Sequence, residues 1–156
     1  MKALAFCMAL LGFSACGDEA DEYGSPFADY KIKGVVVSSD QAGQPIENIQ
    51  VIMVDDEVVM GSNTFYVGDT IYTNKDGSFR FDRSAFPSAA IQIRFNDIDG
   101  VENGEFASKS EYILFNDSDF KGSNSSWHLG TAEKDMGTVK LTPQTDTSKP
   151  EEPEER

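Results

Sequence analysis

The chain has 156 residues, with 13 Lys and Arg against 27 Asp and Glu, and its formal net charge at pH 7 is −14. Because phosphate groups bind clustered cations and repel a protein of this charge, we exclude nucleic-acid partners. The two cysteines and the single histidine also exclude zinc sites built from several thiolates or imidazoles. The length suits one domain with additional segments at its ends.

The first 15 residues have the pattern of a secretory signal. Lys2 precedes an apolar run, Ala3 to Leu11, that is too short to span a bilayer as a helix. The segment Phe13-Ser14-Ala15-Cys16 resembles the lipobox of bacterial lipoproteins, with Phe where Leu is usual. The resemblance implies a signal peptide over residues 1–15 and a mature chain that starts at a lipidated Cys16. The alternatives are an ordinary signal peptide and an uncleaved anchor.

Acyl chains such as palmitate would anchor the mature protein to a membrane, because each buried methylene contributes about 0.8 kcal/mol. Residues 16–29 are acidic and contain turn formers, and we expect them to be an acidic tether. The run from Gly17 to Glu22 also resembles the signal that sends Bacteroidetes lipoproteins to the outer face of the outer membrane. We therefore expect a lipid-anchored outer-membrane protein at the cell surface, with the periplasmic face as the alternative.

From residue 30 onward, β-branched and aromatic residues alternate with polar residues and turn formers, which is typical of short strands. The turn Asn74-Lys75-Asp76-Gly77 predicts a hairpin between its flanking strands, and Gly68 predicts a bulge or bend. Since the mature chain shows no convincing helical period, we expect an all-β, antiparallel β-sandwich over residues 30–142. The predicted strands are 30–37, 49–54, 64–67, 69–73, 78–81, 90–95, 110–115 and 137–142.

The alternation also predicts which residues form the core between the two sheets. After Pro143 the apolar residues stop, and we expect residues 143–156 to be a disordered acidic tail. The expected core residues are Val35, Val37, Val51, Met53, Phe79, Phe81, Ile91, Ile93, Phe95, Val139 and Leu141.

Four of these segments together resemble the carboxypeptidase regulatory-like, transthyretin-like domain family. They are the strand Lys33 to Val37, the turn Gly43 to Ile46, the segment Thr73 to Phe81 and the closing strand Met136 to Leu141. The resemblance implies a transthyretin-like sandwich with disordered ends. It implies no particular activity, because this fold hosts many functions.

A second resemblance rests on the lipobox together with the segments Tyr23 to Gly34 and Asn96 to Phe106. These resemble Bacteroidales lipoproteins whose genes lie beside a radical S-adenosylmethionine (radical SAM) enzyme. The resemblance implies that such an enzyme is a partner, which would modify this protein or act in the same pathway. Cys16 is the only cysteine of the mature chain, which argues against a sulfur-based cross-link.

One acidic loop has the composition of a cation site. Acidic side chains spaced around glycine turns can converge on Ca²⁺, which prefers oxygen ligands. The alternative is a turn in which the Asp side chains bond their own backbone. An EF-hand is excluded because its last ligand would fall on Ser108. The candidate calcium ligands are Asp97, Asp99, Glu102, Asn103 and Glu105.

Two further positions could carry function. Thr70, in Asp69-Thr70-Ile71, resembles the Bacteroidetes O-glycosylation motif and is a predicted glycosylation site. Trp127 and His128 follow a Ser- and Asn-rich loop, where they would form either a glycan-binding edge or part of the core. A Ser-His-Asp triad through His128 is disfavoured because the sequence has no nucleophile elbow, so we predict no catalytic residues.

These observations predict a membrane-anchored, non-enzymatic lipoprotein that serves as an interaction or structural module of the cell envelope, without a cofactor. Its expected partners are the membrane, through the lipid anchor, and an envelope protein or a glycan. The alternatives are a calcium-dependent binding module and a substrate or accessory of the radical SAM enzyme.

Overall fold

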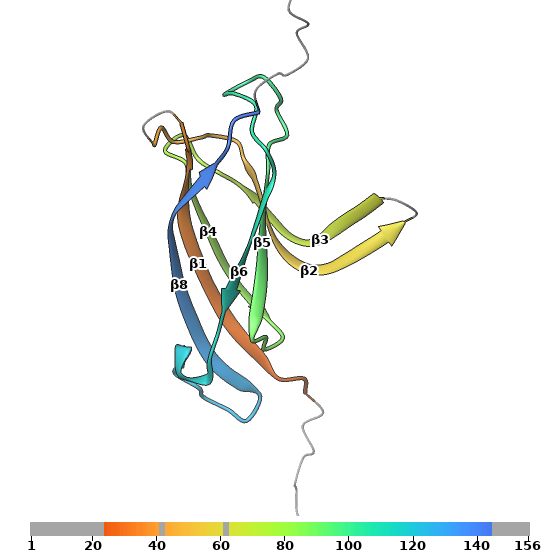
Figure 1. The fold of residues 1–156 in the computed structure, drawn as a ribbon. Coiled ribbons are helices and arrows are strands. Elements are labelled where there is room, and N and C mark those ends of the chain that lie inside the picture. The colour runs from red at the N-terminus through yellow and green to blue at the C-terminus, as the bar shows by residue number, and fades with distance from the viewer. Residues whose placement is uncertain (1–23, 41–42, 61–62, 145–156) are drawn as a thin grey trace, which may run out of the picture.

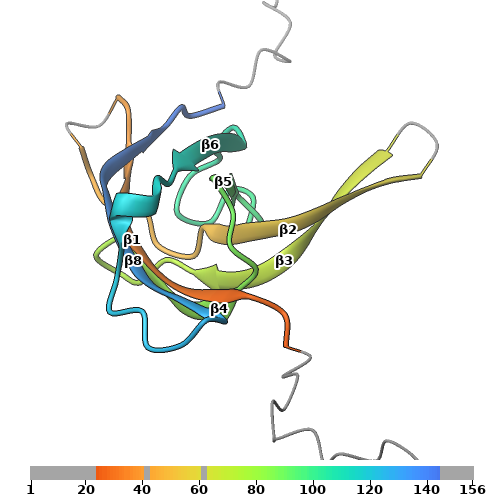
Figure 2. The ribbon, with the colours of Figure 1, turned by 90° about the horizontal axis from the view of Figure 1, so that it is seen from below.

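The computed structural model describes residues 24–40, 43–60 and 63–144, with their side chains except those of 56–65. The described chain forms two sheets packed face to face (Figures 1 and 2). The described helical residues form only a 3₁₀ turn, η1 (Asp117–Asp119). Sheet A has the order β4 (Ser78–Ala85), β1 (Phe27–Ser38), β8 (His128–Leu141) and β7 (Phe120–Lys121). Sheet B has the order β3 (Asn63–Tyr72), β2 (Gln50–Met60), β5 (Ala90–Asn96) and β6 (Lys109–Leu114). The predicted all-β sandwich is therefore confirmed.

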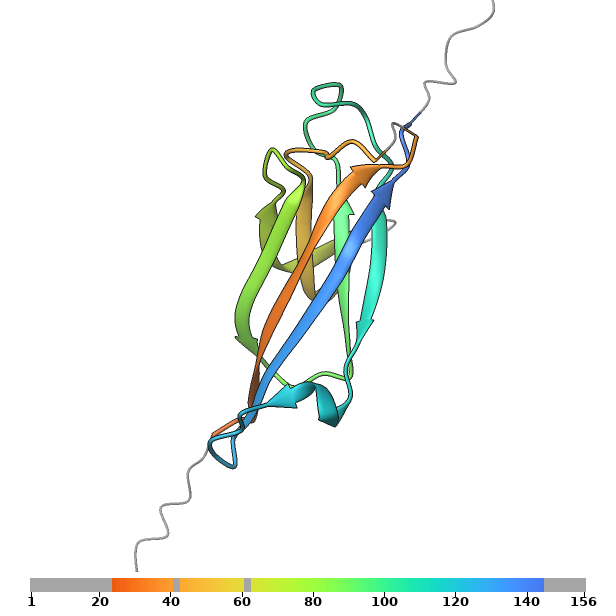
Figure 3. The ribbon, with the colours of Figure 1, turned by 90° about the vertical axis from the view of Figure 1, so that its left-hand side faces the viewer.

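One strand pair departs from the antiparallel arrangement. β1 and β8 run parallel, from the pair Phe27 and His128 to the pair Ser38 and Leu141. A parallel pair needs a long connection, and here nearly the whole domain provides it. The first and last strands thus lie side by side along sheet A (Figure 3).

β8 begins nine residues before the predicted start at Gly137. It contains two bulges relative to β1, and each includes a glycine with positive φ, Gly130 at 115° and Gly137 at 63°. A Cβ at Gly130 would lie 2.5 Å from the carbonyl oxygen of Lys121, so glycine is required there. In the sequence, these two glycines suggest the ends of strands, but in the structure they lie in bulges within one strand.

The segment from Asn74 to Gly77 forms a turn, closed by a 2.8 Å hydrogen bond from the Gly77 amide to the Asn74 carbonyl. The strands on either side of this turn do not pair with each other. β3 pairs with β2 in sheet B, whereas β4 pairs with β1 in sheet A. The predicted hairpin was therefore wrong, because this turn carries the chain from one sheet to the other.

The far half of the β2–β3 hairpin projects from the sandwich (Figures 1 and 2). At its base, a bulge between Val54 and Asp56 of β2 lies opposite Gly68 of β3. A Cβ at Gly68 would lie 2.0 Å from the Met53 carbonyl oxygen, so only glycine fits beside this bulge. The bulge predicted at Gly68 is thus present, but its extra residue, Asp55, belongs to the partner strand β2.

The inner face of β1 carries the even-numbered residues, among them Tyr30 and Val36. The prediction that Val35 faces the core was wrong, because a run of three valines gives no alternation from which its orientation could be read. Val37 is buried near the end of the strand, where it forms a bridge with Pro45. The other predicted core residues are buried as expected, namely Val51, Met53, Phe79, Phe81, Ile91, Ile93, Phe95, Val139 and Leu141.

Several predictions concern residues outside the described part of the chain. The signal peptide over 1–15, the lipidation site Cys16 and the tail beyond residue 144 belong to this group. The described chain already enters β1 at Phe27, three residues before the predicted strand, and Ala28 is fully buried. In the described part, no helix is both long and apolar enough to cross a bilayer.

Phe79 provides a test of the core. Its ring packs edge-on against Phe95 of sheet B, with centroids 5.5 Å apart, and lies over Gly34, its partner in β1. Phe79→Ala should lower the free energy of unfolding by about 3–5 kcal/mol, because it removes a buried ring and leaves a cavity. Urea denaturation measures this change, with the exposed Phe86→Ala as the control. A Phe79→Ala loss below that of the control would show that this ring is not part of the core.

Candidate functional site

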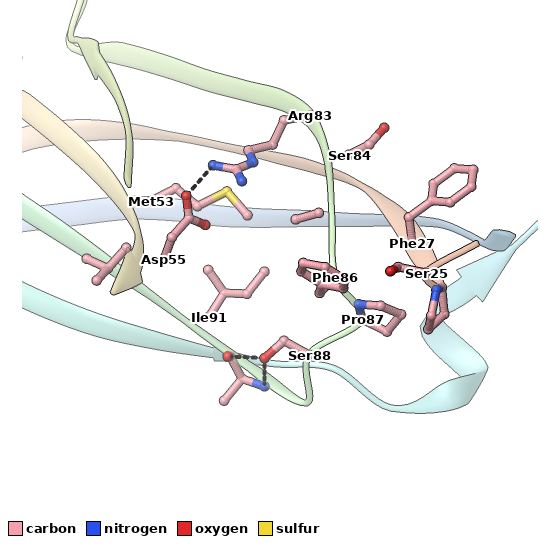
Figure 4. A pocket seen from close by; sticks show the side chains of 14 residues that line it. Ser25, Phe27, Met53, Asp55, Arg83, Ser84, Phe86, Pro87, Ser88 and Ile91 are labelled. Atoms are coloured by element: carbon pink, nitrogen blue, oxygen red, sulfur yellow. Dashed lines mark hydrogen bonds and ion pairs between the residues drawn. The ribbon is translucent and has the colours of Figure 1, made fainter. Parts of the chain in front are cut away.

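Among the described residues, sheets A and B part at one end and leave a cleft of about 760 Å³ (Figure 4). One wall comes from the end of β4 and the loop that follows it, which carries Phe86 and Pro87. The other comes from β2 and β5, with Met53 and Ile91 at its base. Phe86 is 72% exposed although it is large and apolar. Such a residue at the mouth of a cleft is typical of a binding surface.

The buried side chain of Tyr30 holds the loop of this cleft in place. Its hydroxyl accepts a hydrogen bond from the Ser88 amide at 2.8 Å and donates one to the Phe86 carbonyl at 3.3 Å. The Ser88 hydroxyl donates to the Ala90 carbonyl at 2.7 Å, which fixes the entry to β5. The wall that presents Phe86 is therefore preformed by contacts between β1 and the β4–β5 loop.

An ion pair bridges the two sheets at the other side of the cleft. Arg83 of β4 lies 3.1 Å from the Asp55 carboxylate of β2, with the Arg83 side chain only 21% exposed. Asp55 is the extra residue of the β2 bulge, and this position lets its side chain reach sheet A. The cleft thus combines apolar walls with one charged pair, a composition that is common in ligand-binding clefts.

His128 lies at the start of β8, next to the cleft end of β1. Its Nε2 is 2.9 Å from Asp29 Oδ2, its Nδ1 is 2.9 Å from Asn124 Oδ1, and its ring stacks on Phe27 at 4.8 Å. The residue is only 8% exposed. Both ring nitrogens therefore have oxygen partners within the protein, and the arrangement ties the beginning of β1 to the beginning of β8.

Ser84, Asp29 and His128 are brought together, but in an order that differs from a hydrolase triad. The Ser84 hydroxyl donates to the Asp29 carboxylate, which in turn contacts His128. A catalytic triad needs the histidine between the serine and the acid, so that imidazole can remove the hydroxyl proton. Here the carboxylate occupies the middle position, and Ser84 is held as a donor to an acid.

The five predicted calcium ligands share one loop, but the Asp carboxylates of this loop already accept hydrogen bonds from amide groups. Asp97 accepts from the Phe106 amide at 2.8 Å and from the Asp99 amide at 3.2 Å. Asp99 accepts from the side-chain amides of Asn48 and Asn103, each at 2.9 Å. Glu102 and Glu105 are exposed. This geometry matches the turn alternative, although calcium binding itself remains an untested prediction.

The two Asp carboxyls of this loop have pKa values that move in opposite directions. Burial, together with the neighbouring Asp99, raises the pKa of Asp97 above its ordinary value. Hydrogen bonds from Asn48 and then Asn103 lower the pKa of Asp99. In residues 24–40, 43–60 and 63–144, no group of three or more His, Cys, Asp or Glu side chains is arranged to hold a metal ion.

Thr70 and Trp127 occupy separate parts of the molecule. Thr70 is exposed on β3, where it pairs with Ile52 and points to the outer face of sheet B. Trp127 is partly buried and packs beside Gly24, and its carbonyl accepts from the Phe27 amide at 2.8 Å. The structure therefore places Trp127 and His128 at the start of β1 rather than on a free edge.

Sequence reasoning missed the cleft, because its walls come from three segments that are distant along the chain, 25–27, 53–55 and 83–91. Phe86-Pro87 gave a weak local signal, since an aromatic residue before Pro in a loop has no place in a strand pattern. The sequence placed Tyr30 in the first strand, but nothing in it indicated that the Tyr30 hydroxyl would bond the loop after β4. Asp55 directly follows the predicted strand 49–54, and nothing in the sequence indicates that its side chain would reach the other sheet.

No known family matches this chain, and neither does any curated protein. Among solved structures, the chain is similar to a 9R-lipoxygenase from Cyanothece, with 18% identity and a TM-score of 0.35 over 70% of this chain and 16% of that chain. It is also similar to the major pilin subunit BcpA of Bacillus cereus, with 11% identity and a TM-score of 0.38 over 75% of this chain and 30% of that chain. The chain thus spans less than a third of either protein.

Removal of the Tyr30 hydroxyl tests how the cleft is held together. Tyr30→Phe leaves the Ser88 amide and the Phe86 carbonyl without their partner, so it should lower the free energy of unfolding by about 1–3 kcal/mol. The matched control is Tyr112→Phe, which removes the same atom from a 68% exposed ring and should change stability by less than about 0.5 kcal/mol. Equal effects in the two variants would contradict the proposed bracing of this loop.

The cluster around Asp29 predicts a dependence of stability on pH. The hydrogen bond from Ser84, followed by that from His128, lowers the pKa of the Asp29 carboxyl despite some desolvation. A lowered pKa in the folded state means that the ionised carboxylate stabilises the fold above a pH of about 4, and that this contribution disappears as the pH falls through the folded pKa.

Asp29→Asn should therefore destabilise the protein at about pH 6 and much less at about pH 2, as measured by chemical denaturation at each pH. The control is Asp82→Asn, which removes a carboxylate from the outward face of β4, two residues before Ser84. A difference between wild type and Asp29→Asn that stayed constant over this range would contradict the role given to the carboxylate.

Proposed function

We propose that this chain is a non-enzymatic lipoprotein of the cell envelope, anchored through Cys16, whose cleft binds another envelope protein. The observation that supports the proposal most is the preformed cleft with its exposed Phe86. Apolar side chains held on a rigid wall and flanked by a charged pair are typical of protein-binding surfaces, where aromatic residues provide much of the affinity.

The position of the cleft agrees with a membrane anchor. Ser25, Pro26 and Phe27 line it, so the described chain begins at the cleft itself. The nine residues from Cys16 to Gly24 are joined by eight Cα–Cα steps, which span at most about 28 Å when the chain is fully extended. A protein anchored at Cys16 would therefore hold this cleft close to the membrane, within reach of other envelope proteins.

We further propose that the protein belongs to the carboxypeptidase regulatory-like, transthyretin-like domains of Bacteroidales outer-membrane lipoproteins, and that it is displayed at the cell surface. The two-sheet architecture is compatible with this assignment. A non-enzymatic role is favoured by His128, whose two ring nitrogens are engaged by Asp29 and Asn124. Modification by a radical SAM enzyme and glycosylation of Thr70 remain predictions.

Site-specific photocrosslinking in the native host tests both parts of this proposal. A photoreactive residue replaces Phe86 in the cleft or Val101, an exposed residue of a distant loop, and the Phe86 version is also made with Cys16→Ser. We expect the proteins that retain Cys16 to fractionate with membranes and to carry the mass of acyl groups. The probe at position 86 should give a discrete protein adduct that the probe at position 101 does not give.

Cys16→Ser should release the protein from the membrane fraction and reduce the adduct. If this variant stays in the membrane, the anchor is wrong, whereas equal adducts at positions 86 and 101 would contradict a specific partner at the cleft. Absence of any adduct at position 86 in the anchored protein would also overturn the role of the cleft.

A further inference from the structure

The outer face of sheet B differs in composition from the rest of this acidic protein. Within the sandwich, sheet B comprises 50–54 of β2, 68–72 of β3, 90–96 of β5 and 109–114 of β6. The side chains that alternate away from the core in these segments include no Asp or Glu. They include tyrosines, amides, hydroxyls and the apolar Ile52, Val54 and Leu114 around a single Arg94. In a chain with 27 acidic residues, this face is therefore chemically distinct.

Hydrogen bonds connect the polar side chains of this face across three strands. The Asn96 amide donates to Gln50 Oε1 at 3.1 Å, and Arg94 Nε donates to Asn96 Oδ1 at 2.9 Å. Arg94 Nη1 donates to the Ser110 hydroxyl at 3.3 Å, while its guanidinium lies 4.2 Å from the centre of the Tyr66 ring. The planar groups are thus fixed before any ligand arrives, which lowers the entropic cost of binding.

Two exposed tyrosines flank this network. Tyr72 of β3 is 49% exposed and Tyr112 of β6 is 68% exposed. The strand register places Arg94 between them, two residues along the strands from each, so the three side chains follow one diagonal of the sheet. Strand spacing and rise give a separation of about 20 Å between the two tyrosine positions.

We propose that this face binds a neutral glycan chain. A tyrosine ring stacks on the C–H face of a sugar, while amide and guanidinium groups bond adjacent hydroxyls. A diagonal of about 20 Å spans several pyranose rings. The charge favours a neutral chain, because the protein's net charge of −14 repels polyanions, and this face has no carboxylate that a neutral ligand would have to desolvate.

This inference goes beyond the proposed function, because it concerns a different surface and a different class of ligand. The cleft residue Phe86 belongs to the β4–β5 loop, whereas Arg94 and Tyr112 belong to the outer face of sheet B. Glycan binding requires neither the lipid anchor nor the cleft. Failure of one proposal therefore leaves the other untouched.

Affinity gel electrophoresis tests this proposal on the protein purified from its host in a non-glycosidic detergent. The gels contain dextran, xyloglucan, galactomannan or arabinogalactan as neutral probes, and polygalacturonate as the acidic probe. Because Thr70 shares this face, Thr70→Val, which removes the predicted glycosylation site, serves as a second background. We expect at least one neutral polysaccharide to retard the protein in one of the two backgrounds.

Tyr112→Ala and Tyr72→Ala should each weaken this binding by about tenfold, which corresponds to about 1.4 kcal/mol. Phe86→Ala, an equally exposed aromatic position in the cleft, is the matched control and should leave it unchanged. Unfolding midpoints verify that all variants are folded. Retardation by polygalacturonate alone, by no neutral polysaccharide in either background, or to the same extent in Tyr112→Ala would overturn the proposal.

Discussion

The parallel pairing of β1 with β8 is the interaction on which the rest of the sandwich depends. It joins Phe27 to His128 and Ser38 to Leu141, so every other described strand lies within one long loop closed by this ladder. The entropic cost of closing a loop rises only with the logarithm of its length. Burial of inward residues of both strands, such as Tyr30 and Ala132, offsets this cost. In sheet A, β4 and β7 pair with the two outer edges of this ladder, and sheet B packs against its inner face.

The same pairing explains why the cleft forms where it does. At the start of the two strands, His128 and Asp29 connect β8 to β1, and the next inward residue of β1, Tyr30, extends to the β4–β5 loop. On the other side of the cleft, the β2 bulge turns Asp55 toward Arg83, and this ion pair connects sheet B to sheet A. The cleft thus arises from side chains that also satisfy the hydrogen bonds of the fold.

The sequence allowed prediction of those elements whose alternation was regular. β5 alternates without interruption and was placed correctly, and Phe79 and Phe81 share the inward face as expected. β8 was largely missed, because Glu133 and Asp135 pair outward with lysines of β1 and leave few apolar residues in its first half. The acidic loop was recognised, and so was the alternative that its Asp side chains bond their own backbone. The contact of Asp99 with Asn48 could not be foreseen, because Asn48 lies far away in sequence. The cleft gave only the weak local signal of Phe86-Pro87, because its walls come from segments that are distant along the chain.

The two terminal strands also determine how the domain would bear a load. Because they run in the same direction, the described chain enters at one end of the molecule and leaves at the other (Figure 3). β8 has 14 residues, so this axis is about 45 Å long. Tension between an anchored N-terminus and anything held at the C-terminal end would act along the ladder and strain its hydrogen bonds together, in shear, instead of opening them one by one. A load applied to the two ends of the described chain would therefore be borne by the whole β1–β8 ladder.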